Sequence, residues 1–456
     1  MTEMKTQILP GGCRLIEFPE AVDSRGSLSF AQGQEHIPFS IERVFWIYDV
    51  QPGKSRGSHS HNESAEVVIP VCGSFDMFVS DGTHSATVRM DSPRRGILIP
   101  PGLWCELKNF APGTVCIVFA SHPYNAQGYT NDFDQYRNEQ VRVERYSASK
   151  ADDWNRFVAA SRNGTFLLDR NYMDYHSDRF EDCSLMFYLH DELIAVLPAD
   201  WNGVEHVVRS HGGLTYGGLV MSGKVTAVTA LQIFSAAIDF MKRELGAQRW
   251  LYKPIPYIYS IQPSEEDLYA LFRCGGKLVS RGVSSVIDQQ ERLPMRELRR
   301  RGAAKAARNG LSVRVGDTGA DLEAYWEVLS SVLQEKHNRK PVHTVQEMRL
   351  LMQRFPEKIR LHVVECQGQV VAGSVVYNAG TVAHAQYIGA SAKGKECGAL
   401  DLLFKELIDV TYSSCRYFDF GISTENGGNW LNEGLVFQKE GFGARTVTYD
   451  AYMTEL

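Results

Sequence analysis

The sequence predicts a multidomain protein in which an all-β domain precedes two mixed α/β units. The first 140 residues contain short runs of β-branched and aromatic residues that alternate at period two. The later residues alternate strand-like runs with longer helix-like patterns. A length of 456 residues, at about 150 per domain, leaves room for three units. We therefore expect domains over 1–140, 145–290 and 291–456.

The strands expected in the first region are separated by turn signals such as Asp81-Gly82 and Pro112-Gly113. They are expected at 41–50, 66–71, 74–80, 83–90, 96–99 and 114–120. Their regular, short spacing favours an antiparallel sandwich or barrel.

Two cycles of strands and helices are expected after residue 145. The main elements are a hairpin over 185–198, helices over 225–245, 319–336, 344–354 and 398–412, and strands over 359–366, 369–377 and 417–421. This order is typical of two successive α/β units rather than of one large sheet.

Composition excludes several classes of protein. The net charge of −6 gives no electrostatic support for bulk nucleic-acid binding. No apolar run approaches the roughly 20 residues that a membrane helix needs, and the start resembles no signal peptide. The nine cysteines form no CxxC pair, which is typical of reduced thiols, so we expect a cytoplasmic protein with no membrane or nucleic-acid partner.

Two histidines on a predicted strand carry the clearest chemical signal. Residues two apart point to the same face of a strand, so His59 and His61 project together, and Glu66 follows after a turn. The full spacing is Gly53-x5-His59-x-His61-x4-Glu66-x6-Gly73, followed by Pro100-x-Gly102-x2-Cys105-x3-Asn109. It resembles the two cupin motifs, with Cys105 where the second motif has a metal-binding histidine.

Three interpretations of the histidines stay open at this point. They can be structural, or they can form a zinc or iron site with Glu66 and Cys105. They can also perform general acid/base catalysis, because an imidazole titrates near neutrality and moves a proton in either direction. We favour acid/base catalysis, without a metal.

Several runs over residues 10–138 resemble the sugar 3,4-ketoisomerases, a family of metal-free cupins. The runs are 23–28, 37–44, 56–61 and 91–93, together with Trp104. The resemblance implies conversion of dTDP-4-keto-6-deoxyglucose to its 3-keto isomer, with His61 as base and His59 as its partner. The substrate-binding residues that it suggests are Arg25, Arg43, Arg56, Glu66 and Trp104, the arginines for the pyrophosphate.

The sequence departs from this family at three places. Phe45 and Trp46 stand where the family usually has tyrosine, so a proton relay would run through Tyr48 or water. Cys105 replaces histidine, and Glu66 replaces glutamine. These departures keep open an alternative in which the cupin is a binding or regulatory module of a monofunctional acyltransferase.

The later region resembles the Fem-type N-acyltransferases, which carry two tandem GNAT-like folds. The runs that carry the resemblance are 166–168, 172–179, 210–218, 299–310, 417–421 and 437–443. It implies transfer of an acyl or aminoacyl group to an amine. Candidate residues for this transfer are Asp419, Lys439 and Tyr216.

A small-residue loop before a predicted helix, 391–399, is a candidate phosphate site for an acyl-CoA donor, by default acetyl-CoA. Its candidate cofactor-binding residues are Lys393, Lys395 and Gly398; a simple helix cap is the other interpretation. The basic run Arg296–Arg308 fits coenzyme A phosphates, a tRNA donor or a solvated helix face.

The two resemblances together predict a bifunctional enzyme. The isomerase product, once aminated by a separate enzyme, is a dTDP-3-amino-3,6-dideoxyhexose, and the acyltransferase would acylate that amine. We expect a homodimer that serves a bacterial surface glycan such as the O-antigen of lipopolysaccharide, with an edge strand near 23–30 exchanged between subunits.

Overall fold

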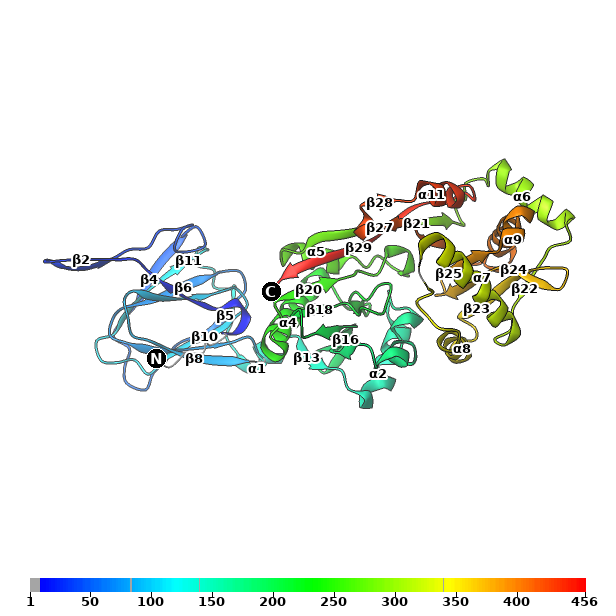
Figure 1. The fold of residues 1–456 in the computed structure, drawn as a ribbon. Helices are drawn as coiled ribbons and strands as arrows, with labels where there is room; N and C mark the ends of the chain where they lie inside the picture. The colour runs from blue at the N-terminus through cyan, green and yellow to red at the C-terminus, as the bar shows by residue number, and fades with distance from the viewer. Residues whose placement is uncertain (1–8, 83, 139, 339) are drawn as a thin grey trace. The chain divides into compact units, whose positions relative to one another are not determined.

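The computed structural model describes residues 9–456 except 83, 139 and 339, and its contacts divide the chain into two units (Figure 1). The first unit contains residues through Val143 with the segments Phe187–Leu193 and Gln232–Leu245. The second contains Glu144–Met186, Ile194–Leu231 and Gly246–Leu456. The division of the later region at residue 290 stays a prediction.

The first unit is built on two five-stranded antiparallel sheets. One sheet has the order β1 (Arg14–Glu17), β9 (Arg95–Ile99), β6 (Glu66–Cys72), β11 (Val115–Ala120) and β4 (Arg43–Ile47). The other has the order β12 (Tyr129–Thr130), β5 (Arg56–His61), β10 (Trp104–Lys108), β7 (Phe75–Ser80) and β8 (Ser85–Met90). A short helix, α1 (Phe133–Asn138), follows them. This arrangement confirms the predicted all-β cupin fold.

Alternation along the strands fills the interior of this domain. On β7, Phe75, Met77 and Val79 are fully buried, while the residues between them are partly exposed. Strand β6 is buried continuously from Glu66 to Pro70 and lies between β9 and β11. The strand predicted over 83–90 begins at a residue outside the described ones, and the strand observed there is β8.

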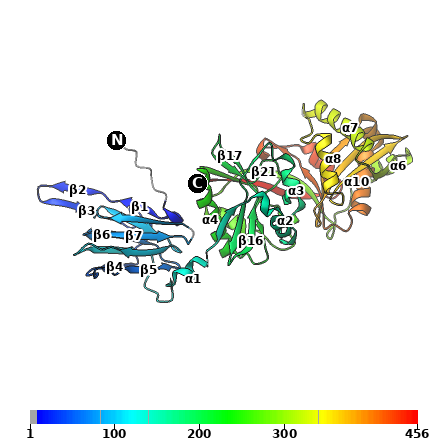
Figure 2. The same cartoon turned by 90° about the horizontal axis from the view of Figure 1, so that it is seen from below.

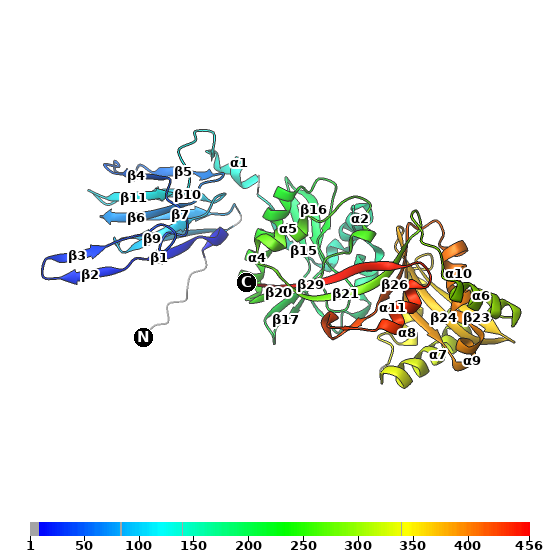
Figure 3. The same ribbon diagram turned by 90° about the horizontal axis from the view of Figure 1, so that it is seen from above.

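A β-hairpin of β2 (Glu20–Asp23) and β3 (Gly26–Ser29) extends from the barrel, as Figures 2 and 3 show. Every residue of the two strands is exposed, including the apolar Val22 and Leu28 at 69% and 60%. A hairpin that leaves two large apolar side chains open to solvent is a candidate surface for pairing with a second chain.

The later region contains a four-stranded and an eleven-stranded sheet. The four-stranded sheet has the order β13 (Arg142–Arg145), β15 (Leu185–Leu189), β16 (Glu192–Leu197) and β19 (Val220–Met221). The eleven-stranded sheet has the order β14 (Glu181–Asp182), β17 (Asp200–Asn202), β18 (Val207–Arg209), β20 (Arg249–Tyr252), β29 (Arg445–Glu455), β21 (Lys277–Asp288), β26 (Tyr417–Ile422), β25 (Val382–Ala390), β24 (Gln369–Asn378), β23 (Ile359–Cys366) and β22 (Ser312–Val315). The predicted alternation of strands and helices is confirmed. The expectation against one large sheet is wrong, because the eleven-stranded sheet takes strands from both predicted units.

The helices of this region follow the predicted pattern closely. They are α2 (Ala151–Ala160), α3 (Arg170–Met173), α4 (Ala227–Leu245), α5 (Glu266–Arg273), α6 (Glu297–Arg308), α7 (Ala320–His337), α8 (Val345–Arg354), α9 (Ala392–Cys397), α10 (Ala399–Glu406) and α11 (Glu433–Glu440). Thr344 begins α8 with a capping box, because its side chain accepts from the Glu347 amide and Glu347 reaches back to the Thr344 amide.

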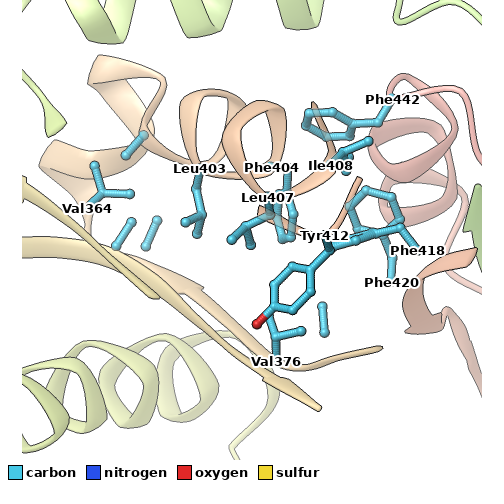
Figure 4. Packing of buried hydrophobic residues seen from close by; sticks show 14 of the residues in the cluster. Val364, Val376, Leu403, Phe404, Leu407, Ile408, Tyr412, Phe418, Phe420 and Phe442 are labelled. Carbon is cyan, nitrogen blue, oxygen red and sulfur yellow. The ribbon is translucent and has the colours of Figure 1, made fainter. Parts of the chain in front are cut away.

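An aromatic and aliphatic core joins α10 to the sheet (Figure 4). Leu403, Phe404 and Leu407 point from the helical segment toward Val364 and Val376 of the strands. Phe418, Phe420 and Phe442 extend the cluster toward α11. This core fixes the position of β26, whose continuation bears on the site below.

Two further sequence expectations can be compared with the structure. All nine cysteines are free thiols. Among the described residues, none of the helices combines the length and the apolar character that a membrane crossing requires.

Candidate active sites

The two histidines of β5 face each other at one end of the cupin barrel. His59 Nε2 lies 3.1 Å from His61 Nε2, and the rings meet nearly edge to face. His61 is buried and His59 is half-buried. The strand places them there because β5 pairs with β10 on one side and with β12 on the other. The structure thus confirms that both imidazoles project to the same face.

Glu66 and Arg43 complete a buried polar array around His61. Glu66 Oε1 lies 3.1 Å from His61 Nε2, and Arg43 Nη2 donates to the same oxygen at 3.2 Å. Both Glu66 and His61 are almost inaccessible to solvent. A proton on His61 Nε2 has acceptors on His59 and Glu66 within 3.1 Å, so it can pass from one imidazole to the other.

Tyr129 is a member of the site that sequence reasoning missed. Its ring centroid lies 4.9 Å from that of His59 and 4.6 Å from that of His61, and Arg43 Nη1 is 3.5 Å from its hydroxyl. The short strand β12 brings it beside His61. Tyr48, which we expected as a relay, is 56% exposed at the end of β4. No local motif marks Tyr129, because only strand pairing places it at the histidines.

Burial favours the neutral forms of His59 and Cys105. The pKa of His59 is lowered, chiefly by burial and next by the charge that His61 can carry. Burial raises the pKa of the Cys105 thiol, so this cysteine is a neutral thiol at neutral pH. Among the described residues there is no group of three or more His, Cys, Asp or Glu arranged to hold a metal ion.

The other predicted substrate-binding residues are spread over the domain. Arg25 lies in the exposed β2–β3 turn and forms an ion pair with Asp23. Arg56 is exposed at the first residue of β5. Trp104 pairs with Ser60, so it lies on the opposite face from the histidines and packs against Phe133 and Tyr136. Of the predicted arginines, Arg43 is the one in contact with Glu66 and near the histidines.

A cavity of about 980 Å³ lies in the later region, where two parallel strands separate. Strands β25 and β26 pair only over Val382–His384 and Tyr417–Asp419. Beyond this point β25 continues to Ala390, and both strands contribute residues to the cavity wall. Separated parallel strands expose backbone amides and carbonyls that a bound acyl donor can use.

A carboxylate and an imidazole meet at the fork between these strands. His384 Nδ1 lies 2.8 Å from Asp419 Oδ2, and the two residues are register partners on β25 and β26. Asp419 is fully buried, whereas His384 lines the cavity. Sequence reasoning identified Asp419 but missed His384, because its run, Val382–Ala390, contains no recognisable motif.

Lys439 also lines this cavity, from the C-terminal turn of α11. Its Nζ donates to the carbonyls of Gly421 and Ile422 at 2.8 and 3.1 Å and to Ser423 Oγ at 2.9 Å. Burial lowers its pKa to about 8, against the opposing influence of the Asp419 charge. The lysine therefore fixes the backbone at the end of β26, beside the fork.

The remaining predicted residues lie at different distances from the cavity. Lys395 lines it, while Lys393 is exposed and reaches Gln367 at 3.4 Å. Gly398 separates α9 from α10 at φ +80°, and a Cβ there would lie 2.6 Å from the Gly302 carbonyl oxygen. Tyr216 is buried and donates to Thr165 Oγ1 at 3.0 Å. Gly398 thus has a packing reason to be glycine, where α10 approaches α6.

Comparisons with known proteins give matches to both regions of the chain. Residues 11–141 match the family model described as "WxcM-like, C-terminal" (FdtA), and residues 295–429 match an acetyltransferase (GNAT) domain model. The chain is 33% identical over 124 residues to the TDP-4-oxo-6-deoxy-alpha-D-glucose-3,4-oxoisomerase of Aneurinibacillus thermoaerophilus, covering 27% of this chain and 89% of that protein. Through its first domain, the chain belongs to the family of these sugar-nucleotide oxoisomerases.

Two solved structures are also similar to parts of the chain. A 3,4-ketoisomerase from Helicobacter canadensis is 33% identical over 28% of this chain and 95% of its own, with a TM-score of 0.27. FemX is 11% identical over 69% of this chain and 97% of its own, with a TM-score of 0.51. The second likeness concerns the fold alone.

These findings confirm the predicted class of protein. The chain joins a domain of the 3,4-ketoisomerase family to a region with a GNAT acetyltransferase domain and a FemX-like fold. It is an enzyme that combines an isomerase with an N-acyltransferase.

Proposed function

We propose that the first domain converts dTDP-4-keto-6-deoxyglucose to its 3-keto isomer, and that the later region acylates the amino sugar made from that product. The observation that carries the first part is the buried array of His59, His61 and Glu66 in a domain of the oxoisomerase family. The relative from Aneurinibacillus thermoaerophilus is named for this keto sugar, and we extend its substrate to this chain.

In the proposed isomerisation, His61 removes the proton from carbon 3, which leaves an enediolate. The proton on oxygen 3 moves to oxygen 4 through His59, and a proton returns to carbon 4 from His61. Glu66 stabilises the positive charge that His61 acquires, since an opposite charge 3.1 Å away favours the imidazolium. General acid/base catalysis of this kind contributes about a hundred- to ten-thousand-fold.

Nucleotide binding is proposed for the arginines and the aromatic residues of the domain. Arg43 is held at the site by Glu66, and we assign it, with Arg25 and Arg56, to the pyrophosphate. Trp104 lies on the opposite face of the sheet from the histidines. We therefore propose that it supports substrate binding away from the reacting carbons.

For the second activity we propose acetyl-CoA as donor and a dTDP-3-amino-3,6-dideoxyhexose as acceptor. The GNAT match over 295–429 includes both forked strands and the loop before α9. We assign Lys395, which lines the cavity, to binding of the acyl donor, together with Lys393 and Gly398. Lys439 and Asp419 are assigned to the place where the acyl group is transferred. The two steps fit together because amination of the isomerase product creates the amine that is acylated.

We further propose that the enzyme works as a homodimer in the cytoplasm, on a bacterial surface glycan such as the O-antigen of lipopolysaccharide. The nine free thiols suit a reducing compartment. The exposed apolar hairpin of β2 and β3 offers a surface for the second subunit.

The isomerase is tested by incubating the full chain with dTDP-4-keto-6-deoxyglucose in deuterated water and following the sugar by NMR. We expect a 3-keto sugar that carries deuterium, no conversion with His61→Asn, and full conversion after treatment with a chelator. His84→Asn is the matched control, because His84 lies in the turn before β8 and contacts Asp81. Lack of conversion by the wild-type chain would contradict the proposal and favour a monofunctional acyltransferase with a cupin binding module.

A further inference from the structure

The imidazole at the fork of β25 and β26 has the geometry of a proton acceptor. We infer that His384 is the general base of the acyltransferase, and that Asp419 is a positioning residue that acts through it. This inference rests on the proposed acyl transfer and deepens it, because it names the group that removes the proton from the acceptor amine.

Asp419 is enclosed by hydrogen-bond donors and does not reach the cavity. Ser284 Oγ and the Gly421 amide donate to Oδ1 at 2.5 and 2.8 Å, and Tyr449 donates to Oδ2 at 2.7 Å. Burial acts to raise the pKa of Asp419, but His384 and these donors outweigh it and hold the pKa at about 2. The carboxylate therefore stays ionised and cannot itself take a proton from an amine at neutral pH.

His384 connects this carboxylate to the cavity. A carboxylate only accepts hydrogen bonds, so the 2.8 Å contact places the ring proton of neutral His384 on Nδ1. The other ring nitrogen, Nε2, then carries a lone pair. Gly421 lies beside this edge of the ring, since a Cβ there would lie 3.4 Å from His384 Cε1 and 4.0 Å from Nε2. The pair thus presents a fixed acceptor at the cavity.

The reaction balances with these two residues and the two proposed substrates. The acceptor nitrogen attacks the thioester carbonyl, forming a C–N bond as its proton passes to His384 Nε2. The C–S bond then breaks, and the coenzyme A thiolate takes the proton from the imidazolium, directly or through water. Asp419 stabilises the imidazolium between these steps, and the products are an amide and a free thiol.

The other titratable groups beside the pair are Tyr449, Tyr259 and Lys439. Tyr259 lies 3.0 Å from the Tyr449 hydroxyl and 3.5 Å from Asp419 Oδ2. The pKa values of both tyrosines are raised by burial, so they stay neutral donors. The charge of Asp419 also acts on Lys439, but Lys439 is hydrogen-bonded to the backbone at the end of β26.

The test measures acetyl transfer from acetyl-CoA to dTDP-3-amino-3,6-dideoxyglucose and its galacto epimer, from pH 5 to 9. We expect His384→Gln to lower kcat by about a hundred- to ten-thousand-fold and to leave the KM for acetyl-CoA near the wild-type value. Asp419→Asn should also lower kcat with little change in this KM, because the imidazole loses the carboxylate that fixes the proton on Nδ1.

His362→Gln is the matched control. His362 is a buried histidine of β23 that contacts the Tyr412 hydroxyl at 2.9 Å, and it is not among the described residues that line the cavity. We expect this variant to keep the wild-type pH profile. If His384→Gln folds, as judged by thermal unfolding, and retains the wild-type kcat, the assignment is overturned.

A second measurement separates this inference from the proposed acceptor. If the wild-type chain acetylates neither amino sugar, the proposed acceptor is wrong, and His384 is then judged by its reaction with diethyl pyrocarbonate. We expect mass spectrometry to show modification at His384 that acetyl-CoA suppresses, and no such protection at the exposed His206. An unreactive His384, or one that acetyl-CoA does not protect, would contradict the inference.

Discussion

At the scale of single residues, each candidate site contains one buried carboxylate that is surrounded by hydrogen-bond and ion-pair partners. In the cupin domain this group is Glu66, which contacts both His61 and Arg43. In the later region it is Asp419, which accepts from four donors. In both cases a carboxylate holds a histidine in place, and we propose that the histidine transfers the proton.

Removing the Glu66 carboxylate should damage the isomerase. Glu66→Ala leaves Arg43 without this buried partner and His61 without its anion, and hydrogen bonds to charged groups are worth about 1.5–3 kcal/mol. We expect kcat of the isomerase to fall about tenfold to a hundredfold, measured by NMR. Glu66→Gln keeps an acceptor oxygen and should recover much of the rate; equal loss in both variants would contradict the account.

Cys105 should be unreactive in the folded protein. Burial raises its pKa and holds that of Cys116 at about 11, and only a thiolate reacts rapidly with an alkylating agent. Both thiols remain protonated as long as the pH stays below these pKa values. We expect iodoacetamide at pH 8 to modify the exposed Cys72 and to spare Cys105, as peptide mass mapping will show. Rapid labelling of Cys105 would contradict a buried neutral thiol.

The sequence allowed some of these residues to be predicted and not others. His59 and His61 are two apart on one strand, so their common face follows from local geometry. Tyr129 and His384 reach their sites only through pairing with distant strands, β5 and β26. Such pairing depends on the whole fold, and neither residue lies in a spacing pattern that would mark it.

At the scale of elements, glycines determine how closely some strands and helices approach. Gly57 precedes the histidines at φ +77°, and a Cβ there would lie 2.9 Å from the Cys105 carbonyl oxygen. A register shift between Cys105 and Glu106 on β10 lies opposite this position. The irregular pairing therefore lets β5 turn His59 and His61 into the site.

Gly398 provides a test at the same scale. It adopts φ +80°, and a Cβ would lie 2.6 Å from the Gly302 carbonyl, so Gly398→Ala should separate α10 from α6. A non-glycine residue in this conformation costs about 1–2 kcal/mol before any clash. Gly310→Ala is the matched control, because Gly310 has φ +75° and open space around it.

We expect Gly398→Ala to lower the Tm more than Gly310→Ala does. Each kcal/mol corresponds to about 2–4 °C for a domain of 150–250 residues. Calorimetry of the full chain measures both shifts. Equal shifts, with a raised KM for acetyl-CoA in Gly398→Ala alone, would instead support a role for this glycine in donor binding.

Elements were predicted more reliably than their ends. The segment predicted as one helix over 398–412 is α10 followed by a π-helical turn over Leu407–Thr411. The apolar spacing continues through both, so periodicity alone did not reveal the change of winding. By contrast, the helix predicted over 344–354 matches α8 (Val345–Arg354) to within one residue.

At the scale of the whole molecule, the chain carries an isomerase-family domain and an acyltransferase region, each with its own candidate site. We propose that the first of these determines the oligomeric state. Leu28 and Val22 are exposed on the β2–β3 hairpin. We expect the double variant Val22→Asp/Leu28→Asp to convert a dimer to a monomer in light scattering, since charged residues block strand pairing between chains. A wild-type monomer, or an unchanged dimer in the variant, would contradict the hairpin as the contact.

The central claim is that one chain performs the first and the last of three steps on the same hexose. We would incubate the full chain with dTDP-4-keto-6-deoxyglucose, a separate pyridoxal-phosphate aminotransferase with glutamate, and acetyl-CoA, and identify the products by mass spectrometry. The account predicts an N-acetylated amino sugar with the wild-type chain, unreacted keto sugar with His61→Asn, and free amino sugar with His384→Gln. Unchanged keto sugar or accumulated free amine with the wild-type chain would contradict it.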